Sequence, residues 1–75
     1  MTPRLPTLKA RDIIRVLNLL GFRKSRQSGS HAFFKHFDGR ITTVPIHAGK
    51  DISRGLFSEI LNEIGMEYEE FQKYL

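Results

Sequence analysis

The chain has 75 residues, a formal net charge of +4 and no cysteine. Its length and its lack of cysteine exclude several classes of protein. A chain of this length supports one small domain with a single thin core, so we expect residues 1–75 to form one domain. The lack of cysteine excludes a disulfide framework and a thiolate zinc site, and it fits a cytoplasmic protein. No apolar run has the length or flanks of a signal peptide or a membrane span, so we expect neither.

The charge is divided unevenly along the chain. Residues 1–50 sum to +8 and residues 51–75 sum to −4. A basic body with an acidic tail is typical of a protein with a polyanionic partner such as nucleic acid. A solvated surface with uneven charge has the same totals, so composition leaves both interpretations open.

The first part of the chain predicts an extended segment followed by a helix. Pro3 and Pro6 make residues 1–8 an extended lead-in. Over residues 10–20 the apolar side chains recur at the spacing of one helical face. Gly21 follows directly and can adopt the left-handed conformation that ends a helix.

Three strands joined by tight turns come next. Segment 22–27 is too short and too charged for a helix, and segment 28–30 is turn material. Residues 31–37 form the second strand, residues 38–39 a favoured Asp-Gly turn, and residues 40–44 a β-branched third strand. Alternate side chains of a strand face opposite sides, and here both sides carry a phenylalanine. The sequence therefore leaves the buried face open, and we interpret both phenylalanines as core rather than as base-stacking residues.

The remaining chain predicts a loop and two helices. The loop covers residues 46–52, and the next helix begins near Ser53, a good N-cap residue, and ends at Gly65. A short helix over residues 67–74 is expected to dock through Phe71, Tyr74 and Leu75. The predicted fold is therefore α+β, with helices on one face of a three-stranded antiparallel sheet and the other face or an edge free for a ligand.

His31 is the strongest candidate for chemistry. It stands at the mouth of a strand, directly after a glycine-led turn, and Lys24, Arg26 and Lys35 are close to it in the sequence. An imidazole exchanges protons near neutral pH because its unperturbed pKa is about 6.5, and nearby cations would hold a phosphate against it. A strand histidine without a function is the competing interpretation.

Two further candidates lie in the loop before the second helix. His47 is either a second proton-transfer group or, as we favour, a residue that fixes the helix entry. Lys50 offers a point charge for phosphate, aided by backbone amides at the helix start. We expect no metal site, because His31 and His36 face opposite sides of one strand and no His-Glu-x-x-His spacing occurs.

Several motifs of this chain occur together, and as a set they resemble the HicA-type toxins. The resemblance covers residues 10–75, and its two most specific pieces are the Gly-Ser-His and Val-Pro-x-His-x-Gly-Lys segments at this separation. The matching positions are Gly21-Phe22, Arg26-Gln27-x-Gly29-Ser30-His31, Thr42-Thr43-Val44-Pro45-x-His47-x-Gly49-Lys50-x-Ile52, Gly55, Ile60-Leu61, Gly65 and Glu69-Glu70-Phe71.

The resemblance implies a double-stranded-RNA-binding-domain-like fold and a ribosome-independent mRNA interferase of a type II toxin–antitoxin pair. It implies one catalytic histidine, which falls on His31, and a HicB-type antitoxin that masks the active site. From the composition and spacing above, we expect a cytoplasmic protein with no membrane contact, no metal and no small-molecule cofactor. The residues expected to contact RNA are Lys24, Arg26, Ser30, Lys35 and Lys50.

These observations favour metal-independent cleavage of RNA, in which His31 takes the proton from a ribose 2′-hydroxyl. Two other classes stay open at this point. One is a non-catalytic RNA-binding module with the same fold, which needs no histidine. The other is a protein-interaction domain whose positive charge serves an acidic partner.

Overall fold

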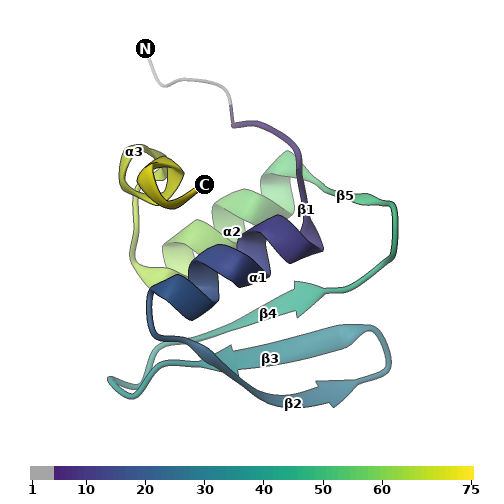
Figure 1. Cartoon of the computed structure of the whole chain (residues 1–75), viewed down its shortest axis with the longest axis vertical. Coiled ribbons are helices and arrows are strands. Elements are labelled where there is room, and N and C mark those ends of the chain that lie inside the picture. Colours follow the sequence, from purple (N-terminus) through teal and green to yellow (C-terminus); the bar gives the residue numbers. More distant parts are fainter. Residues whose placement is uncertain (1–4) are drawn as a thin grey trace.

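The computed structural model describes residues 5–75 and confirms the α+β class, in an arrangement consistent with a double-stranded-RNA-binding-domain-like fold (Figure 1). Residues 1–4, which include Pro3 of the expected lead-in, lie outside the described residues. The elements are, in chain order, β1 (Leu8–Lys9), α1 (Ala10–Leu19), β2 (Arg23–Ser28), β3 (His31–Lys35), β4 (Ile41–Pro45), β5 (Asp51–Ile52), α2 (Arg54–Ile64), α3 (Tyr68–Phe71) and the 3₁₀ helix η1 (Gln72–Tyr74).

The main sheet consists of β2, β3 and β4 in that order, all antiparallel, so β2 and β4 are its edges. The register of β2 shifts between Lys24 and Arg26, which leaves Ser25 in a bulge. In a strand without the bulge, Ser25 would stand opposite Phe33, because Lys24 stands opposite Phe34 and the two strands run antiparallel. The bulge sets Arg26 opposite Phe33 instead.

One face of this sheet is buried under the helices. Ala32 and Phe34 of β3 and Val44 of β4 are buried, and both α1 and α2 pack against β4. The alternate residue Phe33 is only half-buried and belongs to the opposite face. The structure thus shows which face of the strand is buried, a point that the sequence did not decide. Phe34 belongs to the core, as predicted, whereas the prediction that Phe33 is a core residue is wrong.

The helices follow their predicted patterns. Ile13, Val16 and Leu17 of α1 are fully buried, and Gly21 ends the turn after this helix with φ of +99°. The first turn of α2 is capped by Ser53, whose side-chain oxygen accepts the Leu56 N–H at 3.2 Å. The apolar spacing and the cap together account for the position of both helices.

Two features differ from the prediction. The expected loop and lead-in contain β5 and β1, which pair with each other through Leu8 with Ile52 and Lys9 with Asp51. At the other end of the chain Phe71 is buried as expected, but Tyr74 and Leu75 are 37% and 43% exposed. Residues 72–74 form a 3₁₀ helix in which no residue is buried, so the docking of this last segment ends at Phe71.

Across residues 5–75, the helices are all too short or too polar to cross a membrane.

Candidate nucleic-acid interface

His31 is the first residue of β3 and lies exposed at one end of the sheet. Its partners across the sheet are Ser28, the last residue of β2, and Pro45, the last residue of β4. The Ile46 N–H donates to the Ser30 carbonyl at 2.6 Å, which ties the turn before His31 to the loop after β4. The β2–β3 turn, His31 and the loop that leads to β5 therefore meet at the same end of the sheet (Figure 1).

The sheet face opposite the helices, here called the open face, has the charge that RNA requires. Residues directly opposite one another in neighbouring strands share a face, so the open face holds His31, Phe33, Lys35 and Arg26. None of the residues of β2, β3 and β4 is Asp or Glu. A phosphate on this face consequently meets no like charge from the strands below it.

The cations predicted to contact RNA are distributed differently. Arg26 lies over the Phe33 ring, with its Cζ 4.1 Å from the ring centroid. Lys35 shares the open face but lies four residues along the strand from His31, about 13 Å away. Lys24 pairs with the buried Phe34, so its Cβ points to the helix side, and its Nζ donates to Gln27 Oε1 at 3.1 Å. The structure thus brings Arg26 near His31, leaves Lys35 farther along the same face, and separates Lys24 from both.

The loop that carries His47 and Lys50 is anchored at its base. The Lys9 Nζ lies 2.6 Å from Asp51 Oδ1 and donates to the Gly49 carbonyl at 3.0 Å. The hydrogen bond and charge of Lys9 hold the pKa of Asp51 below its ordinary value of 3.8. This contact adds to the β1–β5 pairing and joins the loop to the start of α1.

Both candidates in this loop are accessible. His47 and Lys50 are exposed, and the Lys50 N–H donates to the His47 carbonyl at 3.1 Å, which closes a turn. The loop lies between two hollows of about 220 and 250 Å³, and both candidates line each hollow. The imidazole of His47 makes no hydrogen bond within residues 5–75. No hydrogen bond of this ring therefore supports the expectation that His47 fixes the start of the helix.

The third histidine has a different environment. His36 is buried, its Nε2 lies 3.2 Å from the Leu20 carbonyl, and its Nδ1 accepts the Asp38 N–H at 3.2 Å. A carbonyl only accepts, so Nε2 carries the proton that is donated to Leu20, while Nδ1 faces the Asp38 N–H and also lies 3.1 Å from Asp38 Oδ1. A Cβ added at Gly21 would lie 3.0 Å from Nε2, so the backbone there is closely packed on the ring.

The turn beyond His36 is held by charge. The Arg40 backbone N–H and, to a lesser extent, the Arg40 guanidinium donate to the Asp38 carboxylate, and they hold the pKa of Asp38 below its ordinary 3.8 although desolvation acts in the opposite direction. The Arg40 Nη1 also donates to the Ile64 carbonyl at the end of α2. We assign His36, Asp38 and Arg40 to the framework of the fold, a role that the sequence reasoning did not give them.

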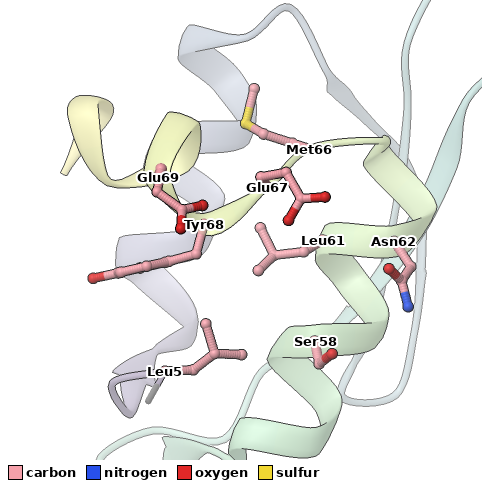
Figure 2. Close-up of a pocket in the computed structure, with 8 residues that line it drawn as sticks. All are labelled: Leu5, Ser58, Leu61, Asn62, Met66, Glu67, Tyr68 and Glu69. Carbon is pink, nitrogen blue, oxygen red and sulfur yellow. The ribbon is translucent and has the colours of Figure 1, made fainter. Parts of the chain in front are cut away.

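A separate hollow of about 150 Å³ lies between α2, the segment that leads into α3 and the start of the described chain, and no residue of the main sheet lines it. Figure 2 shows the apolar side chains of Leu5, Leu61 and Met66 around it, with Glu67 and Glu69 beside them. It is lined by no histidine, lysine or arginine. Two carboxylates and no cation make it unsuited to a phosphate.

The arrangement also bears on metal binding. His31 is exposed on the open face and His36 is buried on the helix side, as the alternation of the strand predicts. Within residues 5–75 no group of three or more His, Cys, Asp or Glu side chains is placed to hold a metal ion.

Comparison with known proteins gives one family. A family model described as the HicA toxin of bacterial toxin–antitoxin systems matches residues 10–66, from the start of α1 to the turn after α2. The matched range contains His31, His47 and all the cations of the interface described above. No curated protein matches the chain.

Proposed function

Because the chain belongs to the HicA toxin family of bacterial toxin–antitoxin systems, we propose that it is an endoribonuclease that cleaves messenger RNA with His31 as general base. The observation that carries this proposal is the position of His31: exposed, at the end of the central strand on an open face whose strands contain cations and no carboxylate. Such a surface attracts the phosphates of RNA and leaves an imidazole free to reach the ribose.

The reaction needs one proton acceptor and one proton donor. The His31 imidazole removes the proton of a ribose 2′-hydroxyl, and the resulting oxygen attacks the adjacent phosphorus in line. The bond between phosphorus and the 5′-oxygen breaks as the new bond forms, which leaves a cyclic phosphate on one product and a 5′-hydroxyl on the other. General base catalysis of this kind contributes about 10²–10⁴-fold to the rate.

The remaining candidates have supporting roles in the proposal. Arg26 and Lys50 stabilise the charge that develops on the phosphoryl oxygens, and the backbone around Ser30 positions the strand entry. Lys35 contacts a more distant phosphate along the open face, and Lys24 contacts RNA only where it reaches around the sheet edge. The proton donor to the leaving oxygen is His47, a lysine or water.

The family also implies an antitoxin, and we propose a HicB-type protein as the partner. To neutralise the toxin, such a partner must cover His31 or the open face next to it. Co-expression of the neighbouring gene product should therefore restore growth to cells that express this chain.

A modified substrate tests the reaction. The purified chain, freed from any inhibitor, should cut a single-stranded RNA in the presence of a chelator and leave products with cyclic phosphate ends. Replacement of the scissile nucleotide's 2′-hydroxyl by hydrogen should abolish the cut. Cleavage of that deoxy substrate would contradict the 2′-hydroxyl mechanism, and binding of RNA without any cleavage would reduce the protein to an RNA-binding module.

A further inference from the structure

Phe33 and Arg26 form a stacked pair next to His31. Phe33 is half-buried on the open face, two residues after His31, and the Arg26 Cζ lies 4.1 Å above its ring centroid. The bulge at Ser25 produces this contact, since it sets Arg26 opposite Phe33. The Ser25 hydroxyl also donates to the Phe33 carbonyl at 3.2 Å, so the bulge is hydrogen-bonded to the residue that Arg26 covers.

The guanidinium of Arg26 is not used by the fold. Among residues 5–75 it takes part in no ion pair and no hydrogen bond, whereas Arg23 donates to the carbonyls of Asn18 and Phe22 and Arg40 to Asp38 and Ile64. Its contact within the described chain is the aromatic ring beneath it. The planar outer face of the guanidinium and its donors are therefore available to a ligand.

We propose that Phe33 and Arg26 form a subsite for one unpaired nucleobase of the RNA strand whose phosphate lies at His31. This inference rests on the proposed function and adds the form of the substrate. Unpaired bases stack on aromatic rings and on arginine planes in RNA-binding proteins. Two residues of a strand span about 6.6 Å, so one nucleotide can lie with its phosphate at His31 and its base at the pair.

The subsite restricts the form of the RNA that can bind next to His31. A base inside an A-form duplex is already stacked on both faces and paired along its edge, so it cannot lie on the guanidinium. The proposal therefore requires a single strand at His31, although the fold is like that of double-stranded-RNA-binding domains. The preference for an unpaired base comes from the surface chemistry of the open face.

Binding by a cleavage-inactive form tests the subsite without dependence on catalysis. In a His31→Ala background, Phe33→Leu keeps the apolar bulk and removes the ring. We expect it to weaken binding of a single-stranded RNA by roughly 5- to 100-fold, as for loss of one stacked base, and to remove the preference over a duplex of the same sequence. Phe37→Leu is the matched control, because Phe37 is 94% exposed in the β3–β4 turn and lies at the other end of β3.

Fluorescence gives a second readout. The chain has no tryptophan, so Phe33→Trp places a single reporter at the subsite and Phe37→Trp a single reporter away from it. Single-stranded RNA should quench the emission of Phe33→Trp and leave that of Phe37→Trp unchanged. Unchanged emission of Phe33→Trp at saturating RNA, or equal affinity of Phe33→Leu and the parent for the single strand, would overturn the subsite.

The two proposals fail separately. Cleavage by the unmodified chain together with binding that ignores Phe33 supports the nuclease and rejects the subsite. Binding that depends on Phe33, from a chain that leaves RNA intact, supports the subsite and rejects the nuclease. Thermal melting of each variant shows whether a loss of binding reflects a loss of fold.

Discussion

One histidine begins β3 and another directly follows its last residue, and the two lie in opposite environments. His31 stands after a glycine-led turn, exposed, with an open face beside it. His36 is buried, with both ring nitrogens bonded to the backbone and with the rings of Phe22 and Phe37 about it at centroid distances of 5.0 and 4.6 Å. The difference shows that the residue type alone does not decide the role of a histidine. An imidazole is available for chemistry only where the fold leaves its ring nitrogens without hydrogen bonds.

Loss of the exposed histidine should have the largest effect on activity. We expect His31→Ala to reduce RNA cleavage about 10²–10⁴-fold, because the general base is removed. The free energy of unfolding should change by no more than about 0.5 kcal/mol, since the side chain is on the surface. Cleavage assays and thermal melts of the same preparation check both expectations, and full cleavage by the variant would remove His31 from the mechanism.

Loss of the buried histidine should reverse this pattern. His36→Ala leaves the Leu20 carbonyl and the Asp38 N–H without partners, so we expect a loss of about 1–3 kcal/mol of stability. Cleavage per folded molecule should be retained. Denaturant unfolding measures the loss, and Phe37→Ala is the control, because it removes a neighbouring ring that is exposed. A His36→Ala protein that is stable but inactive would contradict the framework role.

The cations of the His31 end should control the salt dependence of RNA binding. Each phosphate contact to a single strand contributes about 0.7 to the slope of log affinity against log salt. We expect Arg26→Gln and Lys50→Gln each to reduce the slope by about that amount, and Lys24→Gln to reduce it less, because Lys24 points to the helix side. Lys73→Gln, which alters a cation paired with Glu70 in the acidic tail, should leave the slope unchanged.

The smallest effect concerns acid stability at the His36 end. The pKa of Asp38 is lowered chiefly by the Arg40 backbone N–H, so the ionised carboxylate stabilises the fold above the ordinary value of 3.8. This contribution is lost as the pH falls through the lower, folded value. Asp38→Asn should therefore melt slightly below the parent at neutral pH, and the two curves should converge in strong acid. A constant difference at all pH values would show that the ionised form is not the cause.

The order of the elements was predictable because apolar spacing and glycines mark it. Ile13, Val16 and Leu17 are all buried, and the Asp38-Gly39 turn lies where expected. The β1–β5 pairing was not predicted, since strands of two residues show no periodicity and this one joins positions far apart in the chain. Such a pairing depends on tertiary contacts, here including the Lys9–Asp51 ion pair.

For the candidate site, the sequence singled out His31 but did not predict the arrangement of the side chains around it. The segment Arg23–Ser28 has no apolar alternation, so nothing in it marks the bulge at Ser25. That bulge decides that Arg26 and not Ser25 stands opposite Phe33, and hence which cation is near the candidate base. With one phenylalanine on each side of β3, the helices had to be placed before the open face could be identified.

The position of β2 as an exposed edge strand has a further consequence. An unpaired edge offers its N–H and C=O groups to any other chain, and proteins suppress such self-association with charges and bulges. All six residues of β2 are exposed and polar, and the strand contains both devices. The β2 side chains that we propose to attract RNA are therefore also suited to keep copies of the toxin from pairing edge to edge, so their exchange for apolar residues should lower solubility.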